Sequence, residues 1–247
     1  MKTSGNTILV TGGGSGIGEA IAHRLHDAGN TVIIAGRRQA ALDAAIAGRS
    51  GMQAITFDAA DTTSIVSLAE RVTAQYPALN VLINNAGIMR NEDVASRRDL
   101  TDAEAQVATN LLGPIRLIDA LVDHLKAQAD SAIINVTSGL AFVPLVRAAT
   151  YSATKAALHS YTMALRAALA GKVEVIEWAP PAVRTGLTPG QEKNEMFLPL
   201  ADFIDESYAL MMQAETPSEI IVQRAKFQRN AEAEDRFPAT FKTLNGL

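Results

Sequence analysis

The sequence contains no cysteine. Disulfide bonds, thiolate nucleophiles and cysteine-ligated metals are therefore excluded, and a reducing compartment is compatible with the chain. Histidine is also scarce. Of His23, His26, His124 and His159, only the first two, three residues apart near Asp27, approach the spacing of a metal site. We expect all four to be ordinary residues on helix surfaces and predict no metal.

Long apolar runs are absent too. No stretch approaches the roughly 18 to 20 apolar residues that cross a bilayer, and the N-terminal segment reaches its glycines before any apolar region of signal-peptide length. Basic residues are not in excess, since 22 Lys and Arg stand against 26 Asp and Glu with no basic stripe. Nucleic acid and anionic membranes are therefore not expected partners. We expect a soluble, cytoplasmic protein.

The composition describes a globular chain. Hydrophobic residues make up 48% of the 247 residues and charged residues 19%, which is enough to bury a core. No repeat with a period of 20 to 50 residues is visible, and no low-complexity linker interrupts the first 180 residues. We therefore predict a single domain over residues 1–247.

Short β-branched runs alternate with longer amphipathic stretches. The runs predict strands at 7–10, 31–35, 53–57, 80–84, 131–138 and 172–178. The stretches between them predict helices near 16–28, 39–47, 62–75, 102–128 and 150–170. Several strands are continuously apolar, as in a parallel sheet that is covered on both faces. The pattern favours the α/β class, with a doubly wound parallel sheet of the Rossmann type.

The pattern changes after Trp178, where four prolines break up a polar stretch. In open α/β sheets ligands bind beyond the carboxyl ends of the strands, so residues 185–215 are predicted to form an irregular or helical substrate lid. The alternative is a surface loop with packing clusters. A helix is expected near 217–234. Pro238 then interrupts the chain, and 240–244 is too short for a central strand, so no regular seventh strand is expected.

A glycine loop follows the first strand and opens a helix. Such a turn directs backbone N–H groups and the positive end of the helix dipole at a pyrophosphate. The spacing Gly-x-x-x-Gly-x-Gly differs from the commoner G-x-G-x-x-G. The strand before it and the helix after it favour a dinucleotide site over an ordinary turn. The candidate cofactor-binding residues here are Thr11, Gly12, Gly14, Ser15, Gly16, Ile17 and Gly18.

The second strand ends in Ala35-Gly36-Arg37-Arg38. An NAD site usually has an acidic residue at this point, on the ribose hydroxyls. Without a carboxylate, the extra phosphate of NADP can bind the two guanidinium groups, whose geometry suits phosphate. Alternatively, Arg37 and Arg38 simply begin a solvated helix. We predict NADP(H) as the cofactor.

Tyr151 and Lys155 lie four residues apart, on one face of a predicted helix. A phenol has an ordinary pKa of about 10, too high for ready proton exchange at neutral pH. A lysine cation about 4 Å away contributes on the order of 4 kcal/mol at an effective dielectric of 20, which predicts a lowered pKa for Tyr151. Ser138, at the end of the fifth strand, is placed to hydrogen-bond a substrate oxygen.

Together these motifs resemble the short-chain dehydrogenase/reductase family over roughly residues 6 to 185. The loop matches its T-G-x-x-x-G-x-G pattern, 84–87 matches N-N-A-G, and 151–155 matches Y-x-x-x-K. The Pro-Pro after the sixth strand, the Gly-Arg-Arg segment and the ending Phe-Lys-Thr-Leu-Asn are similar to its bacterial DltE-like branch. Further roles follow only from this resemblance. Asp58 would contact adenine, Asn110 would bend its helix and hold water leading to the lysine, and the cofactor cleft would be lined by Asn85, Ala86 and Gly87.

One segment departs from the family pattern. After the sixth strand the family commonly has Pro-Gly-x-Val-x-Thr, whereas this chain has Pro-Pro181-Ala-Val183-Arg-Thr185. The resemblance assigns Val183 and Thr185 to the nicotinamide carboxamide. Pro181 removes a backbone donor and fixes φ, so the loop geometry is expected to differ there.

The resemblance implies hydride transfer between NADP(H) and an alcohol or carbonyl compound. Tyr151 would be the general acid/base, Lys155 would tune it and Ser138 would position the oxygen. An NADP(H)-binding redox sensor with little turnover is an alternative, and isomerase or dehydratase chemistry on the same fold is another. The substrate is not readable. An apolar pocket is suggested by Phe142, Val143, Leu145, Met196, Phe197 and Leu198, and packing of the lid is an equal alternative for these residues.

The same resemblance suggests a homodimer. Many family members build a tetramer with a seventh strand and an apolar tail, and here 225–236 is charged and helical in pattern. The long helices carrying Asn110 and Tyr151 form the family's other interface. Their apolar faces contain Leu117, Leu121, Leu125, Leu158, Leu165 and Leu169. We expect a closed two-fold pair through these helices.

Overall fold

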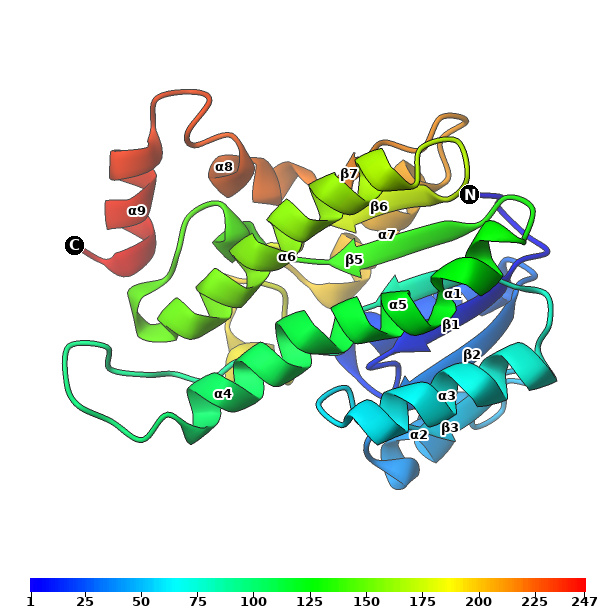
Figure 1. Ribbon diagram of the computed structural model, residues 1–247. Coiled ribbons are helices and arrows are strands. Elements are labelled where there is room, and N and C mark those ends of the chain that lie inside the picture. The colour runs from blue at the N-terminus through cyan, green and yellow to red at the C-terminus, as the bar shows by residue number, and fades with distance from the viewer.

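The computed structural model describes residues 1–247. Its centre is a parallel sheet of seven strands in the order β3-β2-β1-β4-β5-β6-β7. The strand order reverses between β1 and β4, as in a doubly wound sheet (Figure 1). The strands are β1 (Thr7–Thr11), β2 (Thr31–Gly36), β3 (Gln53–Thr56), β4 (Leu79–Asn84), β5 (Ala132–Val136), β6 (Glu174–Trp178) and β7 (Glu219–Ile220). The predicted fold class, a single α/β domain of this type, is confirmed.

Helices cover both faces of the sheet. The helices are α1 (Gly16–Asp27), α2 (Gln39–Ile46), α3 (Thr62–Gln75), α4 (Thr101–Val107), α5 (Gly113–Lys126), α6 (Ala149–Ala168), α7 (Leu200–Met211), α8 (Lys226–Arg229) and α9 (Phe237–Asn245). One apolar core joins α1, α2 and α7 to the sheet, and the other joins α3, α5 and the end of α6 to the opposite face. No helix has the length and apolar character needed to cross a membrane.

The continuous apolar runs of the strands follow from these two cores. Successive side chains of a strand point to opposite faces, so Ile8 and Val10 enter one core while Leu9 enters the other. All five residues of β5 are buried. If one face of these strands were polar, the helices on that side would have no apolar surface to pack against.

The expected helix at 102–128 is interrupted. Between α4 and α5 lies a π-helical turn (Ala108–Leu112) that contains Asn110. Directly after it Gly113 lies so close to the sheet edge that an added Cβ would be 2.6 Å from the carbonyl oxygen of Ala59. The wide turn and the close approach together direct Asn110 inward.

The expected helix near 217–234 is wrong over its first half. Residues Glu219–Ile220 form β7, which pairs with β6, and the rest of that range is helical in a 3-10 turn (Gln223–Ala225) and in α8. Ile220 and Val222 are fully buried against the core, so burial of β-branched side chains outweighs the local helical pattern. The sheet therefore has a seventh strand of two residues.

The C-terminus is helical where the sequence suggested an interruption. Pro238 lies in the first turn of α9, where a backbone N–H has no helical partner to lose. Asn245 at the end of α9 donates to the carbonyl of Pro144 (3.1 Å) and accepts from the N–H of Val146 (2.7 Å). Helix α9 therefore holds the loop between β5 and α6.

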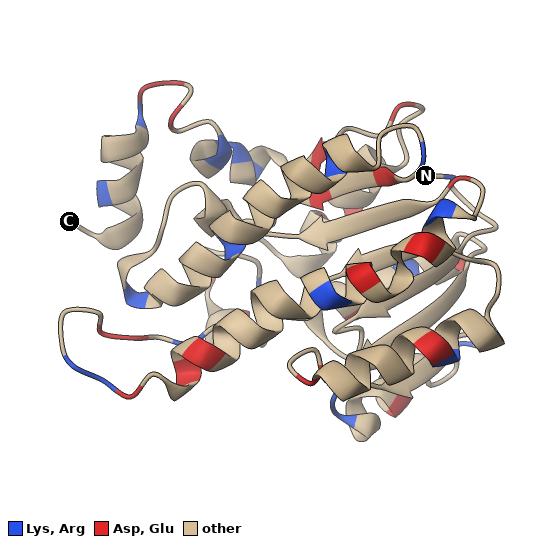
Figure 2. Ribbon diagram, viewed as in Figure 1, with Lys and Arg blue, Asp and Glu red and all other residues tan.

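Charges of both signs are interspersed over the helices. Figure 2 shows no band of Lys and Arg crossing the face in view. On this face the distribution of charge agrees with the balanced composition.

Candidate active site

A cavity of about 500 Å³ opens at the carboxyl ends of the strands. All but three of the predicted site residues line it, although they come from seven separate segments of the chain. Those that line it are Gly12, Gly14, Ser15, Gly16, Ile17, Arg37, Arg38, Asp58, Asn85, Ala86, Gly87, Ser138, Tyr151, Lys155, Pro181, Val183 and Thr185. The three that lie behind its wall are Thr11, Gly18 and Asn110.

Thr11 and Gly18 hold the glycine loop in shape. The Thr11 hydroxyl accepts hydrogen bonds from the N–H groups of Asn85 (3.0 Å) and Ala86 (3.1 Å), which ties the loop to the end of β4. An added Cβ at Gly18 would be 2.3 Å from the carbonyl oxygen of Gly12, and Gly12 itself has φ +68°. Only glycine fits both positions, so the loop presents backbone N–H groups at the start of α1.

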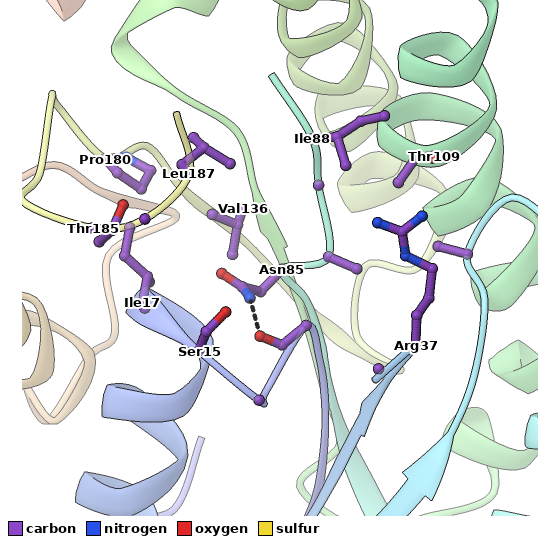
Figure 3. A pocket seen from close by; sticks show the side chains of 18 of the residues that line it. Ser15, Ile17, Arg37, Asn85, Ile88, Thr109, Val136, Pro180, Thr185 and Leu187 are labelled. Atoms are coloured by element: carbon purple, nitrogen blue, oxygen red, sulfur yellow. Dashed lines mark hydrogen bonds between the residues drawn. The ribbon is translucent and has the colours of Figure 1, made fainter. Parts of the chain in front are cut away.

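The far end of the cavity is basic. Arg37 and Arg38 are exposed, and neither guanidinium group forms an ion pair or hydrogen bond with the protein. Figure 3 shows the Arg37 side chain extending along the cavity wall, opposite Ser15 and Ile17. Asp58 lies nearby and accepts a hydrogen bond from the N–H of Ala60 (2.9 Å). Both guanidinium groups are therefore free to bind an anion.

Ser138, Tyr151 and Lys155 converge at the other end. All three side chains are buried, and Ser138 hydrogen-bonds the Tyr151 phenol. The Lys155 ammonium donates to the carbonyl oxygen of Val136 (2.7 Å) and lies 5.7 Å from the centre of the Tyr151 ring. The i, i+4 spacing on α6 therefore places both groups on the cavity, as expected.

The predicted lowering of the Tyr151 pKa is wrong for this arrangement. Burial raises the pKa of Tyr151 to about 12 and outweighs the opposing hydrogen bond from Ser138. Burial also lowers the pKa of Lys155 to about 8. The cost of removing both groups from water outweighs the attraction that was expected between them.

Asn110 holds the backbone of the segment that follows β4, at Ile88, from outside the cavity. Its amide accepts from the N–H of Ile88 (2.9 Å) and donates to the Ile88 carbonyl (2.8 Å). Sequence reasoning missed Gln106, one turn earlier and fully buried, whose side chain accepts from the N–H of Arg90 (3.0 Å). The pair fixes residues 88–90, two of which line the cavity.

Glu92 was also missed. No side chain from the preceding segment caps α6. Instead the Glu92 carboxylate accepts hydrogen bonds from the backbone N–H and the hydroxyl of Thr150, and it pairs with Arg98 (2.8 Å). Burial opposes ionisation, but these hydrogen bonds outweigh it and lower the pKa of Glu92. Thr150 precedes Tyr151, so Glu92 fixes the start of the helix that carries the phenol.

The loop after β6 completes the cavity wall. The side-chain amide of Gln191 donates to the Val183 carbonyl (2.8 Å) and to the Thr185 hydroxyl (3.2 Å). Leu187 and Gln191 also line the cavity, and both fall within 185–215. Figure 3 shows Thr185, Leu187 and Pro180 on this side.

The suggested apolar pocket is not where the sequence placed it. None of its six residues lines the cavity. Phe142 packs edge-on against His159, Val143 is fully buried, and Met196 is 74% exposed. Ile17, Ile88, Val136 and Leu187 provide apolar surface instead.

The histidines are not ordinary surface residues either. His23 hydrogen-bonds the carbonyl of Ala45 (2.7 Å) and His124 that of Leu79 (3.0 Å), so both join elements of the fold. His159 is paired with the fully buried Glu177. No three His, Asp or Glu side chains gather as a metal site.

Comparisons with known proteins agree with this arrangement. Residues 6–196 match the model of the family described as short chain dehydrogenase. The chain is 38% identical to the uncharacterized oxidoreductase DltE of Bacillus subtilis. The alignment has 251 positions and covers 99% of this chain and 98% of that protein.

Solved structures extend the likeness. A short-chain dehydrogenase from Streptomyces avermitilis has a TM-score of 0.83 at 26% identity, over 95% of this chain and 94% of that one. One from Burkholderia cenocepacia in complex with NADP also has a TM-score of 0.83, at 25% identity over 99% of each chain. The cavity combines the glycine loop with a serine, a tyrosine and a lysine, in agreement with these matches. The chain therefore belongs to the short-chain dehydrogenase/reductase family of oxidoreductases, on its DltE-like branch.

Proposed function

We propose that the protein is an NADP(H)-dependent oxidoreductase that interconverts an alcohol and a carbonyl compound. The convergence of Ser138, Tyr151 and Lys155 on one end of a cavity carries the proposal, because two unpaired arginines lie at its other end. A dinucleotide has phosphates and a reactive ring that are recognised separately, and the two groups of residues provide for both.

The residues present fit NADP(H). The glycine loop and the start of α1 would hold the pyrophosphate, and Arg37 with Arg38 would hold the additional phosphate. The relative from Burkholderia cenocepacia was solved in complex with NADP, which supports this choice. When bound, the cofactor supplies the hydride chemistry, and the protein supplies orientation and a proton.

The protein's own step is a proton transfer. With a pKa of about 12, Tyr151 is a neutral phenol at physiological pH and can donate its proton to a carbonyl oxygen. Ser138 would hydrogen-bond the same oxygen. The Lys155 cation, held by the Val136 carbonyl, would stabilise the phenolate that remains.

We propose that residues 185–215 cover the substrate. Leu187 and Gln191 from this segment line the cavity, and Gln191 ties it to Val183 and Thr185. The short β-bridge between Val183 and Leu198 joins the two ends of its first half. The segment can therefore contact cofactor and substrate together.

An activity screen tests the function. The purified protein is given NADPH with a panel of aldehydes and ketones, and separately NADP⁺ with the matching alcohols, and NADPH absorbance is followed. We expect turnover that depends on the carbonyl compound. NADPH binding without turnover across the panel would favour the redox-sensing alternative.

The pH dependence of the reduction rate should follow the ionisation of the Lys155 side chain. Its pKa is lowered to about 8, so the side chain is a cation below pH 8 and neutral above it, whereas Tyr151 keeps its proton throughout. We expect kcat/KM to be level below about pH 8 and to fall about tenfold per unit above it. Steady-state rates from about pH 6 to about pH 10 measure this, with circular dichroism as the folding control. A profile that stays level to about pH 9.5 would contradict the assigned role.

We also propose a homodimer through α4, α5 and α6. The leucines named from the sequence do not form its surface, because all except the half-buried Leu165 pack within the protomer. The exposed apolar residues on these helices are Val107, Leu112 and Met163 instead. Sedimentation equilibrium should give two chains of 26.2 kDa. A mass near four chains would contradict the dimer, and Met163→Lys should shift the equilibrium toward monomer.

A further inference from the structure

A row of polar side chains crosses the sheet just behind the active site. Asn84, Asn135, Glu177 and Glu219 are register partners on β4, β5, β6 and β7. Neighbouring strand residues in register point to the same face of a sheet. Asn84 donates to Asn135 (2.9 Å), and Glu219 is paired with Arg229 on α8. The remaining member, Glu177, is a carboxylate with no exposed surface.

Glu177 has two side-chain partners, one on each of its oxygens. The Thr137 hydroxyl donates to Oε1 at 2.6 Å, and His159 Nδ1 lies 2.6 Å from Oε2. These partners come from different parts of the fold, since Thr137 directly follows β5 and His159 lies on α6. The carboxylate is therefore a bridge between that strand and that helix.

Each partner is adjacent to the catalytic groups. Thr137 directly precedes Ser138, and the carbonyl before it, on Val136, accepts the Lys155 ammonium. His159 is one turn after Lys155 on the stripe of α6 that also carries Tyr151. The bridge thus connects the element that presents the serine to the one that presents the tyrosine and lysine.

Burial of the Glu177 carboxylate has to be explained by what the group does in the structure. Removing a charge from water is costly unless it is paired and hydrogen-bonded, and an apolar side chain of similar size often serves the core equally well. The backbone already joins the two strand ends, since Thr137 N–H donates to the Trp178 carbonyl and Gly139 N–H to the Pro180 carbonyl, both at 2.8 Å. Strand pairing alone does not require Glu177. What the carboxylate adds is the connection to α6.

We propose that Glu177 is a positioning residue for the proposed reaction. By holding Thr137 and His159 together, it fixes the distance and orientation between Ser138 and Tyr151. The proposal rests on the function proposed above. It assigns Glu177 no contact with substrate or cofactor.

Substitutions at Thr137 test the bridge with little risk to folding. Thr137→Val keeps the shape and removes the hydroxyl, and Thr137→Ser keeps the hydroxyl. We expect Thr137→Val and Glu177→Met to lower kcat at least tenfold with the Kd for NADPH within about twofold, since misplacement of reacting groups costs rate rather than binding. Thr137→Ser keeps the hydroxyl donor and Glu177→Gln keeps an oxygen acceptor, so both should retain most of the kcat of the unmutated protein. Unchanged kcat in Thr137→Val would overturn the proposal.

A double-mutant cycle separates positioning from general stability. If the bridge acts through Ser138, Thr137→Val should cost less than about threefold in a Ser138→Ala background, because the group that it positions is gone. A merely structural contact would lower kcat by the same factor in both backgrounds. Equal factors would therefore overturn the proposal even if each single variant is impaired.

Hydrogen exchange of backbone amides measures the effect of the bridge without requiring turnover. Gly139 N–H donates to the Pro180 carbonyl and Leu140 N–H to the Ser138 hydroxyl. Exchange of both amides is measured with NADPH bound. Thr137→Val should speed exchange of these amides at least tenfold, leave β1 and β2 unchanged, and be corrected by Thr137→Ser. If the unmutated protein reduces no carbonyl compound, the proposed function fails and this measurement alone decides the bridge. Unchanged exchange at both amides would overturn it.

Discussion

Replacing Tyr151 by Phe should lower kcat about a thousandfold, within the range that a positioned general acid contributes. The phenol is buried, hydrogen-bonded by Ser138 and next to the lysine, whose ammonium is engaged by the Val136 carbonyl, so the phenol is the group placed to donate the proton. The Kd for NADPH should change less than about twofold, because the hydroxyl contributes little to cofactor binding. Steady-state rates and a fluorescence titration of NADPH measure the two quantities.

Tyr161→Phe is the matched control. Tyr161 lies on the same helix, half-buried beside the second apolar core and away from the cavity. Its variant should keep kcat within about threefold, since removing a half-exposed hydroxyl has a small effect. If Tyr151→Phe keeps more than about a tenth of the activity, the phenol is not the proton donor.

The fold follows from local patterns because its strands are buried on both faces. All five residues of the run Ala132–Val136 are buried, as expected for a parallel sheet that is covered on both faces, and the predicted boundaries of the first six strands agree closely with the structure. β7 could not be predicted in this way. It is two residues long, and its burial comes from α7 and β6, elements that a local window does not contain.

The positions of Tyr151, Lys155 and Ser138 were predictable, but their electrostatics were not. Spacing along a helix gives the direction of a side chain, whereas a pKa depends on everything that surrounds it. Lys155 is held by the carbonyl of Val136, a residue 19 positions earlier in the chain. The surrounding burial raises the pKa of Tyr151 instead of lowering it.

Long-range polar contacts were the least predictable part of the site. Glu92 caps a helix that begins more than fifty residues later, and Glu177 joins Thr137 to His159 across two elements. Each residue looks like an ordinary charged residue in the sequence. Only the topology of the sheet brings these partners together.

The choice between NADPH and NADH should depend on the arginines after β2. We expect NADPH to bind at least tenfold more tightly than NADH, equivalent to about 1.4 kcal/mol, because charge-assisted bonds to phosphate are strong. Arg37→Ala combined with Arg38→Ala should remove this preference and leave the Kd for NADH within about twofold. Fluorescence titrations of both cofactors at one fixed ionic strength measure this, since salt screens exposed charges.

A second double variant separates local contacts from net charge. Arg71 and Arg97 are exposed, lie outside the cavity and pair with no protein group, so replacing both with Ala removes the same charge elsewhere. If the general field of the protein attracts the phosphate, both double variants will weaken NADPH binding equally. If Arg37 and Arg38 contact the phosphate, only their own variant will do so. Equal affinities for NADPH and NADH in the unmutated protein would show instead that these two arginines only face solvent.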